Sequence, residues 1–371
     1  MDNHVARPLP APAPGSAFGP SDFHESGGCF RSRPASRYHR AVLDLQNKPP
    51  SLSLRTLYPA PMPLRTAWLA TGDGHELYLQ ESGNPDGLPV LVLHGGPGSG
   101  CSPLQSRFFD PARYRVICLD QRGAGLSRPR GELALNTTTH LLADLRALRA
   151  RLQVARWLVV GGSWGATLAL AHAIDAPEAV SALLLRGLFL AREQDIARFL
   201  DGAAHGIPQA WATYEAQAAE WQCSLIEALH RILTNEPREA RDALALHWWR
   251  WEQQLAGSDA PELDPQRLAA LVARYRVQSH YLRANCWLDQ PPLLERCAAL
   301  RRVPTLLLHG TLDHICAPSG AAALHARLLH SELRWVHGAG HDPTHPGMVD
   351  AMVRALDAFA GHGNFGGTGR V

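Results

Sequence analysis

The segment from Arg156 to Ala173, RWLVVGGSWGATLALAHA, limits the possible folds more than any other part of the chain. Its first half is an apolar run typical of a buried strand, and its second half is an alanine-rich run typical of a helix. Between them lies the pentapeptide Gly161-Gly162-Ser163-Trp164-Gly165. A sharp turn there leaves no room for Cβ atoms on either side of the serine. Ser163 is therefore either a polar turn residue or a nucleophile at the apex of a strand–turn–helix unit, and the context favours the nucleophile.

Other apolar runs alternate with helical patterns and define the fold class. Strands are predicted at 89–94, 114–119, 156–161, 180–186, 303–309 and 332–337. A helix is predicted at 138–152, with Leu141, Leu145, Leu148 and Leu152 on one face. Such alternation indicates an α/β fold, with a mostly parallel sheet and helices on both faces.

The domain organisation follows from where this alternation stops. Residues 188–298 show no clear strand pattern and are predicted to form a helical cap inserted into a catalytic domain of residues 56–187 and 299–361. Residues 1–55 are rich in Pro, Ser, Gly and Arg, and residues 362–371 have little apolar content. Both segments are predicted to be disordered tails, because they bury too little apolar surface to offset the entropy of ordering.

A nucleophilic serine needs a histidine base and an acid that orients it. In α/β hydrolases the acid and then the histidine follow the serine along the chain, each just after a strand. Asp313 follows the predicted strand 303–309, and His341 lies in a glycine-flanked loop after the strand 332–337. Asp313 could also be an ordinary turn residue, but position and order favour these two residues. The competing candidates nearby are His337, His345, Asp289 and Asp342.

The oxyanion formed during such chemistry needs backbone N–H donors. The motif HGGPGSG, residues 94–100, follows the predicted strand 89–94 and is of the type that supplies one of them. The second donor comes from the residue after the nucleophile. Gly96 and Trp164 are therefore the predicted oxyanion donors, and His94 is interpreted as a structural residue that holds the loop.

Composition argues against several kinds of partner. The formal net charge is only +2, and no dense Lys/Arg block occurs, so neither nucleic acid nor an anionic membrane is expected as a partner. No apolar stretch approaches the length of about 18 residues that a membrane span needs, and the N-terminus lacks the apolar run of a secretory signal. The seven cysteines form no CxxC pair, which favours free thiols in a reducing compartment. We therefore expect a soluble cytoplasmic protein.

Four motifs together resemble the proline iminopeptidases, a serine-peptidase branch of the α/β hydrolases. These motifs are HGGPGSG (94–100), DQRGAGLS (120–127), GGSWGATLAL (161–170) and GAGH (338–341). The likeness extends from about Leu57 to about Ala360. The resemblance implies release of N-terminal proline from peptide substrates, with no metal ion or organic cofactor.

The resemblance also assigns residues to substrate binding. The segment ALHWWRWEQQ, residues 245–254, is similar to a family stretch whose glutamate contacts the substrate amine, which gives Glu252 that role. Trp248 lies four residues before Glu252, so a helix would place both on one face. A carboxylate beside aromatic walls suits a prolyl group, which is a cation on an apolar ring. The alternative is that the tryptophans only pack the cap and Glu252 is solvated.

One position departs from the family pattern. In RVQSHYL, residues 276–282, Gln278 stands where the family has a second amine-binding glutamate. A glutamine contributes no charge, so the affinity for an amine should fall or the substrate should differ. Cys316 matches a cysteine near the family's substrate pocket, although it could equally be a buried thiol. The alternative functions are a related esterase or amidase for another small acyl substrate and, least favoured because the triad candidates are all present, a non-catalytic binding module.

Overall fold

The computed structural model describes residues 53–255, 261–328 and 330–366. Most of the predicted N-terminal tail and the last five residues of the predicted C-terminal tail therefore lie outside the described residues. The described residues from Leu54 onward form one compact unit. None of the described helices is both long enough and apolar enough to cross a membrane.

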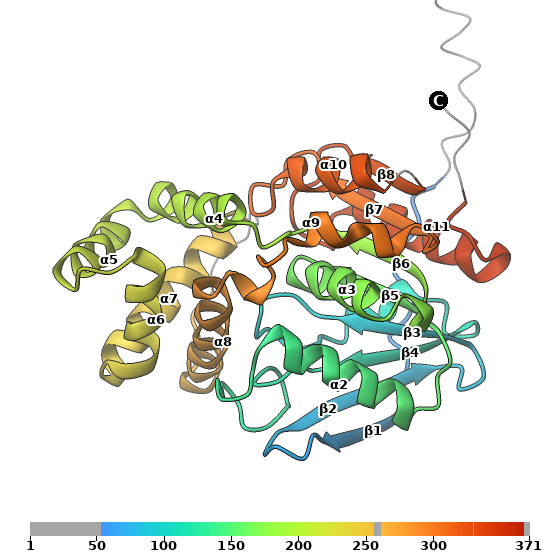
Figure 1. Ribbon diagram of the computed structural model, residues 1–371, viewed down its shortest axis with the longest axis horizontal. Helices are drawn as coiled ribbons and strands as arrows, with labels where there is room; N and C mark the ends of the chain where they lie inside the picture. Colours follow the sequence, from blue (N-terminus) through green and yellow to red (C-terminus); the bar gives the residue numbers. More distant parts are fainter. Residues whose placement is uncertain (1–52, 256–260, 329, 367–371) are drawn as a thin grey trace, which may run out of the picture. The chain divides into compact units, whose positions relative to one another are not determined.

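A single eight-stranded sheet organises the described residues, in the order β1-β2-β4-β3-β5-β6-β7-β8 (Figure 1). The strands β3 to β8 run parallel to one another, and β2 pairs antiparallel with both β1 and β4. This arrangement confirms the predicted α/β-hydrolase fold with a mostly parallel sheet. The bounds are β1 Pro63–Ala70, β2 Glu76–Gly83, β3 Leu88–Leu93, β4 Tyr114–Leu119, β5 Trp157–Gly162, β6 Val180–Arg186, β7 Thr305–Gly310 and β8 Ser331–Val336.

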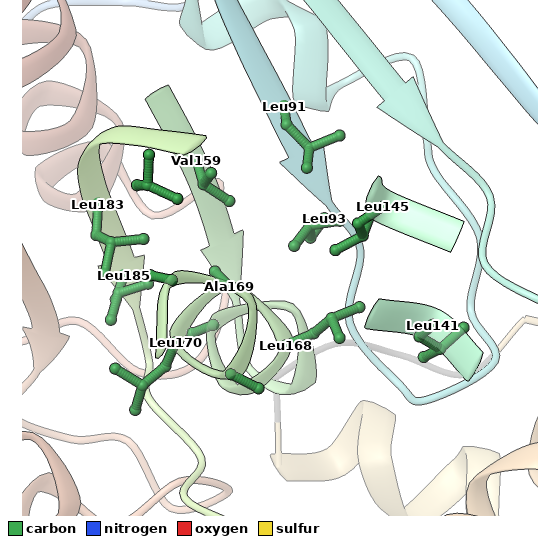
Figure 2. Close-up of a cluster of buried hydrophobic side chains, with 14 of the residues drawn as sticks. Leu91, Leu93, Leu141, Leu145, Val159, Leu168, Ala169, Leu170, Leu183 and Leu185 are labelled. Carbon is green, nitrogen blue, oxygen red and sulfur yellow. The ribbon is translucent and has the colours of Figure 1, made fainter. Parts of the chain in front are cut away.

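Both faces of the sheet are covered by helices. Successive strand residues point to opposite sides, so the apolar strands place side chains on both faces, and each face must be buried. In β3, Leu91 and Leu93 belong to one core cluster, while Val90 and Val92 belong to the other. Figure 2 shows the first cluster, where the leucines of β3 and β6 meet leucines of the helices α2 and α3. The helices of this face are α2 Thr138–Arg151, α3 Trp164–Asp175, α9 Leu293–Arg296 and α10 Pro318–Arg327, and the opposite face is covered by α11 Pro346–His362.

The segment between β6 and β7 is helical, and its described residues contain no strand. We call its five longer helices the cap helices: α4 Glu193–Gly206, α5 Pro208–Glu220, α6 Leu225–Asn235, α7 Arg238–Leu255 and α8 Pro265–Arg283. They have a core of their own, built around Trp211, Trp248, Trp251 and Tyr275. In Figure 1 they form a group apart from the helices that cover the sheet. Whether this group is a domain in its own right stays a prediction.

The ends of the described chain differ from the predicted tail boundaries. Arg55 donates its backbone N–H to Asp350 of α11 at 2.6 Å. At the other end, Phe365 is buried and stacks on Phe359 of α11, with ring centroids 5.0 Å apart. An aromatic side chain buries a large apolar area. Arg334 Nη2 also donates to the backbone carbonyls of Phe365 and Gly366, at 2.9 and 2.7 Å. The buried Phe365 ring and these bonds hold residues 362–366, in a segment whose composition otherwise indicates disorder.

Candidate active site

Ser163 lies at the turn between β5 and α3, as predicted, in a backbone conformation that serine rarely adopts. Its φ and ψ are 57° and −127°. A Cβ on Gly161 would lie 2.2 Å from the carbonyl oxygen of Gly165, and a Cβ on Gly165 would lie 2.1 Å from that of Leu93. Only glycine avoids these overlaps, so the two glycines permit the strained turn that lifts the Ser163 side chain above the sheet.

Asp313 and His341 come together at the carboxyl ends of β7 and β8. His341 Nδ1 lies 2.8 Å from Asp313 Oδ2, and the other carboxylate oxygen accepts the backbone N–H groups of Ile315 and Cys316 at 3.0 and 2.8 Å. The Asp313 side chain has no exposed surface. Burial raises the pKa of Asp313, but the charge and hydrogen bond of His341 and the Cys316 N–H outweigh it and hold the pKa below its ordinary value. Asp313 is therefore an ionised acid that fixes the histidine ring.

The last residue of β6, Arg186, and the residue after it, Gly187, lie against this pair. Gly187 has a φ of +51°, and a Cβ there would lie 3.1 Å from His341 Cε1 and 3.2 Å from Asp313 Oδ2. Arg186 donates from Nη1 to the backbone carbonyl of His341 at 2.5 Å. The position of the His341 ring therefore depends on a residue without a side chain at 187.

We expect Gly187→Ala to lower kcat by about 10- to 100-fold, because displacements of about 1 Å at a reacting group have effects of that size. The matched control is Gly338→Ala, since Gly338 also has a positive φ of +71° but has no atom within 4 Å of the added Cβ. Both variants should lose about 1 kcal/mol of stability from the left-handed backbone alone. Equal kcat values for the two purified variants would contradict a role of Gly187 in placing the histidine.

Ser163 and His341 line one cavity of about 530 Å³. In the described residues their side chains form no hydrogen bond with each other; the Ser163 Oγ contact is with Cys316 Sγ, at 3.9 Å. Catalytic hydrogen bonds are often long without substrate and shorten when it binds. The structure thus brings Ser163, Asp313, His341 and Cys316 to one place, although Cys316 itself is buried behind the cavity wall.

Of the two predicted oxyanion donors, Trp164 follows Ser163 directly in the chain, and Gly96 lines the same cavity as Ser163. A Cβ on Gly95, the neighbour of Gly96, would lie 3.5 Å from the Cβ of Ser163. Trp164 is the first residue of α3, so its backbone N–H has no acceptor within the helix. His94 is fully buried, and its two ring nitrogens contact the carbonyl of Gly95 at 2.8 Å and the N–H of Gln121 at 3.0 Å. These contacts support a structural role for His94 in holding the loop.

The cap helices contribute a polar cluster to the opposite wall of the cavity. Glu252 on α7 and Gln278 on α8 both line it, as expected. Trp248 does not: it is buried in the core of the cap helices, stacked on Tyr275 with ring centroids 5.0 Å apart. The structure therefore places Trp248 behind the site, where it supports Tyr275.

Several lining residues were missed by the sequence reasoning, among them two from the cap helices. Arg274 lies one helical turn before Gln278 on α8, and Phe199 comes from α4. A four-residue spacing puts two side chains on one helix face, so the position of Gln278 was a signal that could have pointed to Arg274. Phe199 had no such signal, because its approach to the cavity depends on how the cap helices pack.

Comparison with known proteins agrees with the geometry. Residues 89–345 match the family model of the alpha/beta hydrolase fold. Among solved structures, the one titled "Crystal structure of VinJ" is similar with a TM-score of 0.61 at 18% identity, covering 80% of this chain and 99% of that one. A structure titled as proline iminopeptidase of Mycobacterium smegmatis gives a TM-score of 0.56 at 18% identity, covering 81% and 100%. The protein is thus an α/β hydrolase.

Relatives with similar sequences show to which family of α/β hydrolases the chain belongs. The chain is 39% identical to a proline iminopeptidase of Xylella fastidiosa strain 9a5c over 82% of this chain and 100% of the relative. It is 38% identical to a proline iminopeptidase of Arabidopsis thaliana over 81% of both. The chain belongs to the proline iminopeptidase family, which confirms the resemblance noted from its motifs.

Proposed function

We propose that the protein is a serine aminopeptidase that releases N-terminal proline from peptides, with Ser163 as nucleophile, His341 as base and Asp313 as the acid that orients it. The contact between His341 and Asp313 beside the strained turn at Ser163 is the observation that carries the proposal. Family membership supplies the substrate class, since the relatives at 38–39% identity are named proline iminopeptidases.

Acylation begins with proton transfer from the Ser163 hydroxyl to Nε2 of His341. Nδ1 is held by Asp313, so the second ring nitrogen is the one available as a base. The serine oxygen attacks the prolyl carbonyl carbon, and the carbonyl oxygen becomes an oxyanion. The N–H groups of Gly96 and Trp164 stabilise this charge, and one such donor typically contributes a factor of about 10²–10³ in rate.

The imidazolium of His341 then gives its proton to the leaving amine, which departs as the shortened peptide. Water attacks the prolyl ester on Ser163, with His341 again removing the proton, and proline is released. None of these steps needs a metal ion or an organic cofactor. The Asp313 carboxylate stays ionised throughout and stabilises the imidazolium as it forms.

The other predictions about this chain complete the proposal. Glu252 faces the prolyl nitrogen from the cap helices, and residues 188–298 act as a cap domain over residues 56–187 and 299–361. A cytoplasmic location is supported by the six described cysteines, all of which are free thiols. They are Cys101, Cys118, Cys223, Cys286, Cys297 and Cys316.

A panel of aminoacyl 4-nitroanilides and short acyl 4-nitrophenyl esters, ranked by kcat/KM, tests the substrate class. We expect the prolyl compound to have the highest kcat/KM among the anilides, because the relatives at 38–39% identity are named proline iminopeptidases. If another aminoacyl group leads by a wide margin, the prolyl assignment is wrong. If only the short acyl esters are hydrolysed, the protein is the related esterase that the sequence left open.

A further inference from the structure

We propose that Arg274 cancels the charge of Glu252, so that the cavity takes, beside prolyl groups, a second class of substrate: acyl groups of the same shape with no charge where proline has its nitrogen. The inference rests on the proposed function, because it concerns the same acyl position. It makes Arg274 a residue that determines specificity.

Glu252 is already paired in the structure. Arg274 Nη2 donates to Glu252 Oε2 at 2.7 Å, and the Tyr275 hydroxyl donates to the same oxygen at 3.0 Å. Tyr275 is fully buried and stacks on Trp248, while the guanidinium of Arg274 lies 5.0 Å from the centroid of the Tyr275 ring. The ion pair is therefore held by the Tyr275 ring, which packs near Arg274, and by the Tyr275 hydroxyl, which donates to Glu252.

The guanidinium of Arg274 stays ionised. Burial lowers the pKa of Arg274, but the carboxylate of Glu252 more than offsets this effect and leaves the pKa above its ordinary value. The side chains of Arg274 and Glu252 are only 25% and 13% exposed, so water screens their charges weakly. To a substrate, this wall of the cavity presents a carboxylate and a guanidinium whose net charge is zero.

Gln278 adds no charge to this wall. It is 3% exposed, and its Oε1 has no hydrogen-bond partner among the described residues. An amide can accept a hydrogen bond through its oxygen or, after rotation, donate one through its nitrogen. Gln278 can therefore meet a ring N–H or a ring oxygen, whereas a glutamate could only accept.

The charge balance decides which groups this wall tolerates. The cap residues that line the cavity are Phe199, Glu252, Gln253, Arg274 and Gln278. Together they offer one negative and one positive charge. A prolyl ammonium there lies beside Arg274 as well as Glu252, and a cation without net compensation is costly to desolvate. A neutral ring has no such cost, and it leaves the ion pair undisturbed.

Two anilides of matched shape test this idea: L-prolyl 4-nitroanilide and the (S)-tetrahydrofuran-2-carbonyl 4-nitroanilide, in which an oxygen replaces the prolyl nitrogen. The measured quantity is the ratio of their kcat/KM values, prolyl over neutral. Both substrates are turned over by the same folded molecules, so partial unfolding of a variant leaves the ratio unchanged. For the unmodified chain we expect a ratio below about 10, because a neutral ion pair exerts little net field.

Arg274→Met should raise this ratio about 10- to 100-fold, the size of effect that one unit charge has at several ångströms in an effective dielectric of about 20. Gln278→Glu should raise it in the same direction by adding a carboxylate. Arg274→Lys keeps the charge and should leave the ratio near that of the unmodified chain. Arg267→Met removes a positive charge from the exposed start of the same helix and should also leave it unchanged.

The outcomes separate this inference from the proposed function. Cleavage of the prolyl anilide alone, or a ratio above about 10³ that Arg274→Met does not change, would overturn the inference and leave the prolyl activity standing. Cleavage of the neutral anilide alone would support the neutral substrate class but contradict the prolyl activity on which the inference rests. Equal ratios for Arg274→Met and Arg267→Met would show that Arg274 does not set the charge of the site.

Discussion

Ser163→Ala is expected to lower kcat on the prolyl anilide by about 10⁶-fold, the loss seen when the nucleophile of a serine peptidase is removed. The remaining rate should exceed that of the reaction in water by about 10³–10⁴-fold, because the oxyanion donors and the cavity are untouched. A fluorophosphonate should label the unmodified protein once per chain. The same reagent should not label the variant.

The melting temperature of the variant is the control for this experiment. Ser163 adopts a strained conformation, with a φ of 57°, that alanine must also adopt, so the variant should melt within a few degrees of the unmodified protein. Labelling of the Ser163→Ala variant at the original level would show that another residue is the nucleophile.

Asp313→Asn should lower kcat by about 10⁴-fold, because an amide at this position favours the wrong tautomer of His341. The backbone N–H groups of Ile315 and Cys316 can still donate to the amide oxygen, so the loop should keep its shape. Separate measurement of kcat and KM checks this. A lowered kcat with a KM close to that of the unmodified protein would place the loss in the chemical step.

The control is Asp289→Asn, the exchange of another acid that was a candidate from sequence. Asp289 lies outside the residues that line the cavity and contacts Asn285 at 3.4 Å. Its replacement should leave kcat within about twofold, as is usual for a surface substitution away from the site. Near-normal activity of Asp313→Asn would mean that a different carboxylate orients the histidine.

The central strands and the Ser163 turn could be predicted from sequence because they are governed by local patterns. Buried parallel strands appear as short apolar runs. The turn needs the two glycines around Ser163, because a Cβ on either would lie only 2.2 or 2.1 Å from a backbone oxygen. Asp313 and His341 could be placed because parallel strands end at one edge of the sheet, where the loops that carry these residues meet.

The hairpin of β1 and β2 was not predicted, and its composition explains why. β1 is exposed along most of its length, and β2 carries Glu76, Gln80 and Glu81. Glu81 is only 4% exposed, yet it is paired with Arg65 and Arg115 from the flanking strands. A charge that is buried through partners from two other strands leaves no apolar pattern in its own segment.

For the cap residues, the sequence indicates the helix face but not the contacts between helices. Glu252 could be assigned through the family resemblance, but its partner Arg274 lies on another helix, 22 positions along the chain. Trp248 was expected in the cavity because it shares a helix face with Glu252, yet that face also packs on Tyr275 of α8. Periodicity gives the face of a helix, whereas the packing of neighbouring helices decides which part of it meets substrate.

The position of the cap helices between two strands of the sheet has a consequence for how new specificities arise. They are inserted between β6 and β7, which are direct neighbours, with Leu183 opposite Thr305. Because the two strands are parallel, the insertion leaves the sheet at the carboxyl end of β6 and the chain returns to it at the amino end of β7. The pairing of the two strands rests on backbone hydrogen bonds that do not depend on the inserted sequence. Recombination within a gene that replaces this stretch as a unit leaves Ser163, Asp313 and His341 beside an unchanged sheet, while it changes the cap residues that line the cavity.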